Sequence, residues 1–192
     1  MSTASEGPGS QSASVSVVTY PELADPAAAR ARMEEIWLVS AARQRAADAA
    51  SRQAFVERWL EPYLRDHADT ILLALGGEGE VLGLLTGCLD SAAAAGTFEP
   101  LHPYYRLFAD LYADYPAHLH INCHPDHRDR GIGSRLIDRF AELCAEAGLP
   151  GLHLITAPGA RNVAFYRRNG FTDAVEREKD GRSYLFLGRR LG

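Results

Sequence analysis

The chain has 192 residues, of which 46% are hydrophobic and 23% are charged, and its formal net charge at pH 7 is −5. This length suits one domain with a full hydrophobic core, and the composition is that of an ordinary globular protein. A mildly acidic chain lacks the basic face that a general nucleic-acid binder needs, so nucleic acid is not an expected partner.

The cysteines and the N-terminal segment bear on where the protein works. Cys88, Cys123 and Cys144 are odd in number and lie in apolar stretches, which favours reduced, buried thiols and a cytoplasmic location. No basic segment followed by an apolar run opens the chain, and no run of about 18 apolar residues occurs, so we expect neither secretion nor a membrane partner. Residues 1–14 are small and polar, which predicts a flexible tail before a single domain over residues 15–192.

Hydrophobic periodicity and turn signals divide the chain into alternating strands and helices. Asp25 and Pro26 open the first helix as its N-cap and first helical residue. The second helix, 47–66, contains Pro62, which should kink or shorten it. Gly87 lies inside a strand and predicts a bulge or the close approach of another group. The expected strands are 15–20, 70–75, 80–89, 117–123, 152–156, 171–175 and 182–187, and the expected helices are 26–40, 47–66, 104–115, 131–147 and 158–168.

Two stretches before the central strand are rich in aromatic residues. In the second predicted helix, Phe55, Trp59 and Tyr63 recur at helical spacing and favour a buried core face over a ligand site. A loop over 91–103 and the amphipathic helix 104–115 follow the third predicted strand. This segment can form part of a substrate-pocket wall, a packing element or a dimer contact, and the sequence leaves the three open.

The central strand, 117–123, places His118, His120 and Asn122 on one face. A buried polar group without a partner costs about 1–3 kcal/mol, so these side chains should meet each other, water or a ligand. Two histidines and an asparagine without a carboxylate or a thiolate are a poor zinc set. No metal is therefore predicted.

A glycine turn follows this strand and has the features of an anion site. Gly131 and Gly133 open a helix, and Arg128 and Arg130 precede them. Free N–H groups at a helix N-terminus, the helix dipole and guanidinium groups together suit a phosphate or pyrophosphate. A larger residue in place of either glycine would hold the phosphate oxygens too far from the amides to form hydrogen bonds. The plain alternative is a tight turn whose glycines only relieve backbone strain. Neither the Lys-Ser/Thr of a P-loop nor the third glycine of a dinucleotide fold is present.

Two motifs stand about thirty residues apart. Residues 128–133 read Arg-Asp-Arg-Gly-Ile-Gly, and residues 165–171 read Phe-Tyr-Arg-Arg-Asn-Gly-Phe. The first resembles the pyrophosphate motif Gln/Arg-x-x-Gly-x-Gly/Ala and the second the aromatic-Tyr-x-x-x-Gly-Phe signature of the GNAT superfamily of acyl-CoA-dependent N-acetyltransferases. More narrowly, residues 114–121 and 187–191 are similar to the acetyltransferase-like C-terminal domain of the O-GlcNAcase family. The GNAT resemblance implies an α/β (α+β) fold in one domain, with a central mixed sheet of about seven strands flanked by helices and one extra helix before the fourth strand.

The resemblance also implies acetyl-CoA as cosubstrate. In GNAT proteins the strands that correspond to 117–123 and 152–156 splay apart, and their unpaired backbone groups bind pantetheine. Backbone groups of Ile121 and Cys123 would hold this arm and the thioester carbonyl. The residues that would hold the pyrophosphate are Arg128, Asp129, Arg130, Gly131, Ile132, Gly133 and Ser134.

Direct attack by an amine needs an acid for the departing thiolate and a base for the proton of the amine. Tyr166 matches the family's usual general acid, a phenol aimed at the CoA sulfur, and the alternative is a core tyrosine beside Phe165. His120 is the first candidate for the base because histidine titrates near neutral pH. His118 and Asp114 are further candidates, and each of the three can equally be a structural polar group.

The chain departs from the family pattern at two positions. Gly159 stands where the superfamily usually has asparagine, and Asn162 stands where alanine is common, so Asn162 is the candidate for the amide contact to pantetheine. Asn122 stands where the O-GlcNAcase-like group often has aspartate, and an amide cannot accept a proton. The first hypothesis is an N-acetyltransferase that acts on an unidentified small-molecule or peptide amine by direct attack in a ternary complex. The second is a non-catalytic acetyltransferase-like module that binds CoA or a protein partner, with the chain a monomer or a homodimer in either case.

Overall fold

The computed structural model describes residues 15–40 and 49–192. The predicted tail 1–14 and the first residues of the predicted helix 47–66 lie outside the described residues. The strands are β1 (Ser16–Thr19), β2 (Leu72–Leu75), β3 (Val81–Cys88), β4 (Ala117–Cys123), β5 (Gly151–Thr156), β6 (Asp173–Lys179) and β7 (Arg182–Arg190). The α-helices are α1 (Pro26–Ser40), α2 (Ala49–Trp59), α3 (Glu61–Asp66), α4 (Ala95–Phe98), α5 (Ile132–Glu146) and α6 (Val163–Arg168). Short 3-10 helices are η1 (Tyr20–Glu22), η2 (Ala68–Thr70), η3 (Tyr105–Leu111) and η4 (Pro125–His127).

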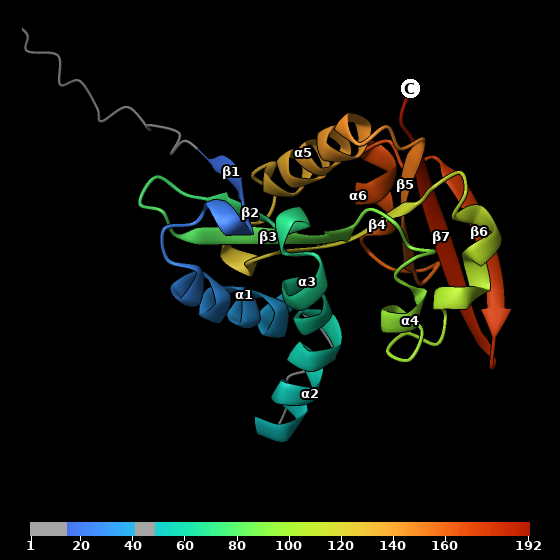
Figure 1. The fold of residues 1–192 in the computed structure, drawn as a ribbon, viewed down its shortest axis with the longest axis horizontal. Coiled ribbons are helices and arrows are strands. Elements are labelled where there is room, and N and C mark those ends of the chain that lie inside the picture. The colour runs from blue at the N-terminus through green and yellow to red at the C-terminus, as the bar shows by residue number, and fades with distance from the viewer. Residues whose placement is uncertain (1–14, 41–48) are drawn as a thin grey trace, which may run out of the picture.

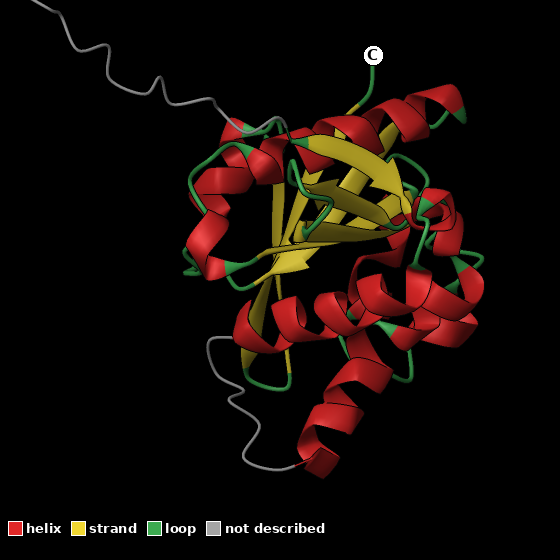
Figure 2. Cartoon of the chain, turned by 90° about the vertical axis from the view of Figure 1, so that its left-hand side faces the viewer, coloured by secondary structure: helices red, strands yellow, loops and turns green. Residues whose placement is uncertain are grey.

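The strands form one mixed sheet of seven in the order β1-β2-β3-β4-β5-β7-β6, which confirms the predicted α/β architecture. Every neighbouring pair is antiparallel except β4 and β5, which are parallel. Figure 1 shows α5 on one side of the sheet and α1, α2 and α3 on the other, and Figure 2 shows the strands fanning out between these layers. Each layer buries its own hydrophobic core against the sheet. No helix in the described part of the chain is both long and apolar enough to span a membrane.

The N-cap residue Asp25 and the helix breaker Pro62 set bounds of the N-terminal helices. The carboxylate of Asp25 accepts a hydrogen bond from the N–H of Ala28 (3.0 Å), which confirms the predicted N-cap. The chain breaks at Leu60 and restarts as α3, with Pro62 in the first turn of the new helix. The second predicted helix is therefore two, as the proline indicated.

The prediction of an α-helix over 104–115 is wrong. The segment forms the 3-10 helix η3 with a kink at Phe108, and α4 lies within the stretch predicted as a loop. Arg177 of β6 holds the kinked segment from outside, because its guanidinium donates to the carbonyl of Leu107 (2.6 Å) and to Asp110 (2.5 Å). Tertiary contacts can override the helical periodicity on which the prediction rested.

The C-terminal boundaries also shift. The helix predicted over 158–168 begins only at Val163, because Pro158 and Gly159 favour the turn that precedes it. The last two strands are longer than predicted, over 173–179 and 182–190. Their turn contains Asp180 and Gly181, both with positive φ, as a tight hairpin requires. The cysteines are all free thiols, and Cys123 is only half-buried, unlike the buried Cys88 and Cys144.

Gly87 provides a test of the packing between the sheet and α5. A Cβ at this position would lie 2.2 Å from Cε2 of Phe140, which is fully buried. We expect Gly87→Ala to lower the free energy of unfolding by about 1–3 kcal/mol, because the ring has no free space to move into. Urea unfolding followed by circular dichroism measures this.

Gly77→Ala is the matched control. Gly77 lies in the β2–β3 turn, its φ is not left-handed, and nothing lies within 4 Å of the added Cβ. Its stability should stay within about 0.5 kcal/mol of the wild type. Equal stabilities of the two variants would contradict the close packing of Phe140 on β3.

Candidate active site

The parallel strands β4 and β5 pair only at their first residues. Ala117 is opposite Leu152 and His118 is opposite His153, and beyond these two positions the strands separate. Each strand keeps its other neighbour, since β3 stays paired with β4 as far as Cys123 and β7 stays paired with β5 over its whole length. The predicted splay is thus confirmed, and a wedge opens in the middle of the sheet.

Backbone groups of β4 face this wedge. The N–H of His124 donates to the carbonyl of Leu82 (3.0 Å), which sets the alternation of the antiparallel β3–β4 ladder. Even-numbered residues of β4 therefore direct their N–H and C=O groups toward β3. Those of Ile121 and Cys123 point toward the wedge, beyond the last positions at which β4 pairs with β5. These are the two residues predicted to bind pantetheine.

The carbonyl of Cys123 is already engaged within the protein. It accepts hydrogen bonds from Oγ of Ser40 (3.2 Å) and from Nε of Arg128 (3.4 Å). A ligand at this end of the wedge would therefore meet the N–H of Cys123 and not its carbonyl.

The predicted anion turn presents consecutive free amides. Asp129 (φ 60°) and Gly131 (φ 75°) are both left-handed, and Gly131 caps α5. The N–H groups of residues 129–134 have no hydrogen-bond partner within the described ranges 15–40 and 49–192. Alternating left- and right-handed residues point successive amides to one side, which is the geometry of an anion-binding nest. Arg130 is exposed beside them and pairs with no described residue.

The two glycines of this turn are required for different reasons. A Cβ at Gly131 would meet nothing, so its positive φ is what favours glycine there. A Cβ at Gly133 would lie 2.8 Å from Cζ of Phe165, so this glycine admits the ring of α6 against α5. Packing is thus a reason for glycine at position 133 that the sequence did not show, and the close approach of a phosphate stays a prediction. Ile132 and Ser134 complete the first turn, with the Ile132 side chain buried in the core.

Tyr166 lies buried on the α5 side of the sheet, between the rings of Phe165 (5.3 Å) and Phe171 (5.7 Å). Burial raises the pKa of its phenol, and the nearby Cys123 thiol raises that pKa further. The phenol therefore stays protonated at neutral pH, as a general acid must before it acts. Asn162 is exposed, and its side chain accepts a hydrogen bond from Thr156 (3.4 Å), which ties the end of β5 to the start of α6.

His118 is fully bonded within the protein. Oγ of Ser91 donates to the carbonyl of Pro116 (2.7 Å), so it must accept from Nδ1 of His118 (2.8 Å). Nε2 of this neutral imidazole is then an acceptor, and the hydroxyl of Tyr63 donates to it (2.9 Å). Neither nitrogen is left for a substrate, so the prediction of His118 as a base is wrong.

Asp114 is also excluded as a base. Its carboxylate is exposed at the surface and lies 3.9 Å from the guanidinium of Arg190. It does not line the cavity described below.

His120 lies on the face of β4 opposite Tyr166, among aromatic rings. The ring centroids of Trp59, Tyr63 and His102 lie 5.1, 6.0 and 6.2 Å away. Its imidazole forms no hydrogen bond with the described residues. Burial lowers the pKa of His120 to about 4, so the ring is neutral at pH 7 and does not titrate near neutrality as predicted.

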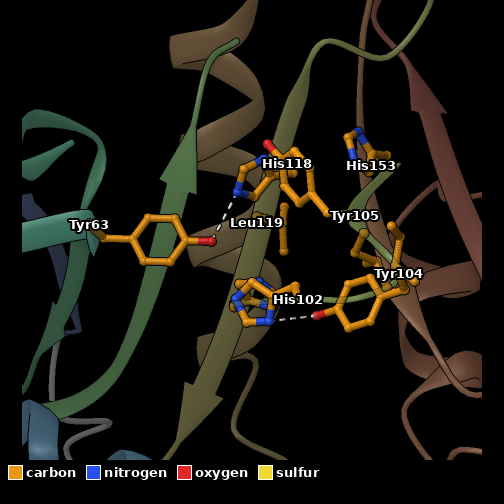
Figure 3. Close-up of a pocket in the computed structure, with 10 residues that line it drawn as sticks. Tyr63, His102, Tyr104, Tyr105, His118, Leu119 and His153 are labelled. Carbon is orange, nitrogen blue, oxygen red and sulfur yellow. Dashed lines mark hydrogen bonds between the residues drawn. The ribbon is translucent and has the colours of Figure 1, made fainter. Parts of the chain in front are cut away.

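A cavity of about 20 Å³ lies where β4 and β5 diverge (Figure 3), with room for roughly one water-sized group. Four histidines, three tyrosines and three aliphatic residues line it, and none of them is an aspartate, glutamate, lysine or arginine. His102, Tyr104 and Tyr105 come from the segment between β3 and β4, which therefore forms a wall of the cavity. A pocket wall was one of the three roles left open for this segment, but sequence reasoning did not single out these three residues. The only signal was a run of ring side chains, His102-Pro103-Tyr104-Tyr105, which spans the end of the predicted loop and the start of the predicted helix.

A family model described as an acetyltransferase (GNAT) domain matches residues 78–173, half of the chain. The chain belongs to this GNAT family. The matched range contains β4, the glycine turn, α5, β5 and α6, which are the elements that build the wedge. No three His, Cys, Asp or Glu side chains that could hold a metal ion come together in the described part of this GNAT domain.

Solved structures share the fold over nearly their whole length. SsHAT is 24% identical with a TM-score of 0.70, over 92% of this chain and 98% of that one. PH1933 from Pyrococcus horikoshii OT3 is 11% identical with a TM-score of 0.68, over 93% and 99% of the two chains. A Drosophila melanogaster polyamine N-acetyltransferase, described as forming N-acetylagmatine, is 15% identical with a TM-score of 0.55, over 93% and 100%. At these identities the likeness concerns the fold alone.

The hydrogen bonds of His118 predict a loss of stability on removing one hydroxyl. Tyr63→Phe leaves Nε2 of His118 buried without a donor, which should lower the free energy of unfolding by about 1–3 kcal/mol. Tyr184→Phe is the control, because its half-buried hydroxyl bonds to none of the described residues. Chemical denaturation compares the two variants, and an equal effect would contradict the structural role of His118.

Proposed function

We propose that this GNAT protein transfers an acetyl group from acetyl-CoA to an amine by direct attack in a ternary complex. One observation carries the proposal: the free amides of residues 129–134 lie at the end of the strand whose backbone faces the β4–β5 wedge. A diphosphate at the turn and an extended arm in the wedge are the two ends of one coenzyme. Bound acetyl-CoA supplies the thioester carbon that the amine attacks.

The two proton transfers of the reaction belong to residues on opposite faces of β4. Tyr166 lies on the α5 side and His120 on the side of α1, α2 and α3, so the wedge is the place where both can serve one reaction. The protonated phenol of Tyr166 donates to the departing sulfur. The neutral imidazole of His120 accepts the proton that the amine loses as its bond to carbon forms.

The subfamily, the cellular location and the acceptor of the protein are three separate proposals. The likeness to the acetyltransferase-like domain of O-GlcNAcase proteins rests on residues 114–121 and 187–191. A cytoplasmic location is supported by the free thiols in the described chain. The acceptor is a small-molecule or peptide amine.

A second function is kept open by two residues. Asn122 cannot act as a base, and Gly159 offers no side-chain amide to pantetheine. Both positions suit a non-catalytic module, monomeric or dimeric, that retains CoA as a ligand or binds a protein partner.

Isothermal calorimetry and an amine-library assay with free-thiol detection test the proposal together. Acetyl-CoA should bind the wild type, and Arg130→Glu should weaken binding by about tenfold or more through loss of a guanidinium contact and repulsion of the diphosphate. Tyr166→Phe should keep acetyl-CoA affinity and lower turnover, because it removes only the proton donor.

Arg182→Glu is the matched control for charge, since it reverses an exposed arginine in the β6–β7 hairpin. It should leave binding unchanged. Absence of acetyl-CoA binding by folded wild type would reject both functions that use CoA. Binding without turnover on any amine would favour the non-catalytic module.

The shifted pKa of His120 predicts an unusual pH dependence. The base must be neutral to accept a proton, and a pKa of about 4 means that it is already neutral at pH 6. The ratio of wild-type to His120→Gln kcat/KM should therefore stay constant from about pH 6 to about pH 8, at about 10²-fold or more. This ratio cancels the titration of the amine itself. A ratio that rises through this range would show a base of ordinary pKa, and a ratio near one would remove His120 from the mechanism.

A further inference from the structure

The segment between β3 and β4 places a buried nitrogen without a partner on the cavity wall. His102 is 2% exposed, and its Nε2 has no hydrogen-bond partner in the described parts of the chain. The backbone around it is fixed, because its N–H donates to the carbonyl of Phe98 (2.9 Å) and its carbonyl accepts from the N–H of Tyr105 (2.9 Å). The orphaned nitrogen is therefore held in place, on the wall of a cavity that the proposed base His120 also lines and that has room for one substrate group of about the size of water.

The other ring nitrogen settles which proton His102 carries. The hydroxyl of Tyr104 lies 3.4 Å from Nδ1 (Figure 3). A phenol is a much stronger acid than a neutral imidazole, so Tyr104 donates and Nδ1 accepts. Burial lowers the pKa of His102 to about 3, with smaller contributions from His120 and Arg58, so the ring is neutral. Nε2 then carries the hydrogen and is a donor without an acceptor.

The surroundings of His102 limit what can supply that acceptor. Its ring packs on Trp59 with centroids 4.4 Å apart and lies 6.2 Å from that of His120. Burial also keeps His118 and His153 neutral by lowering their pKa values. No side chain that lines the cavity is therefore charged at neutral pH, and nothing there would pair with a cation or a carboxylate on the substrate.

We propose that His102 is a specificity-determining residue, whose Nε2–H donates a hydrogen bond to a neutral oxygen on the amine substrate. The substrate class is a primary amine that carries a hydroxyl or carbonyl oxygen and no second charged group. This inference rests on the proposed acetyl transfer. It separates the chain from enzymes built for polyamines, whose distal ammonium groups would find no counter-charge in this cavity.

A series of four amines tests this selectivity. Aminobutanol, pentylamine, diaminobutane and aminopentanoate share one carbon chain and end in a hydroxyl, a methyl, an ammonium and a carboxylate group, respectively. With wild-type protein and saturating acetyl-CoA, kcat/KM for aminobutanol should exceed that for pentylamine by about tenfold, the value of one hydrogen bond. It should also exceed the values for the two charged amines. Equal or faster acetylation of diaminobutane would overturn the substrate class.

Variants of His102 assign this preference to the residue. His102→Phe should bring the aminobutanol-to-pentylamine ratio to about one, because the hydrogen bond that favours the hydroxyl is lost, while the affinity for acetyl-CoA stays within about twofold. His102→Gln, which retains an N–H donor at a similar reach, should keep part of the preference. An unchanged ratio in His102→Phe would overturn the proposal, since a structural role would affect both amines alike.

Tyr104→Phe keeps the test decisive if His102→Phe does not fold. Without the phenol the imidazole proton can move to Nδ1, so the same ratio should fall, and an unchanged ratio in Tyr104→Phe would overturn the proposal. Failure of wild type to acetylate any amine would reject the proposed function itself. Turnover without preference for the hydroxyl would reject only the role of His102.

Discussion

The structure depends on the early end of pairing between β4 and β5. The two strands pair at only two positions, and the second of these pairs His118 with His153. Both histidine side chains are held by hydrogen bonds to residues outside these two strands. Tyr63 and Ser91 bond His118, and Nδ1 of His153 donates to the carbonyl of Tyr115 (2.7 Å). Because β3 and β7 stay paired on the outer sides, the separation leaves unpaired backbone only where a ligand can meet it.

Burial sets the electrostatic character of this region. It lowers the pKa values of His102, His120 and His153 and raises that of Tyr166, so each group is neutral at pH 7. Charge is concentrated instead at the glycine turn, where exposed arginines flank the free amides. The two halves of the site therefore differ in kind: one suits a diphosphate in contact with solvent, and the other suits a reaction among neutral groups at low dielectric.

Local sequence signals predicted the parts of the fold that depend on neighbours in sequence. The bounds of β4, the course of α5 and the glycine turn followed from alternation, helical periodicity and helix-end residues. The site was less predictable, because its partners are distant. Tyr63 lies 55 positions before His118, so no pattern indicated that this histidine is fully bonded. The pKa of His120 and the free nitrogen of His102 likewise follow from tertiary packing, which a single sequence does not reveal.

The contacts from β6 to the segment between β3 and β4 affect the order in which the protein folds during synthesis. Arg177 and Lys179 bind the carbonyls of Leu107 and Pro103, which lie 70 and 76 positions earlier in the chain. The segment that carries His102 is thus secured by a strand that leaves the ribosome late. During synthesis, the wall that faces the substrate becomes fixed only when the β6–β7 hairpin docks, and the same docking pairs β7 with β5 and completes the outer side of the wedge.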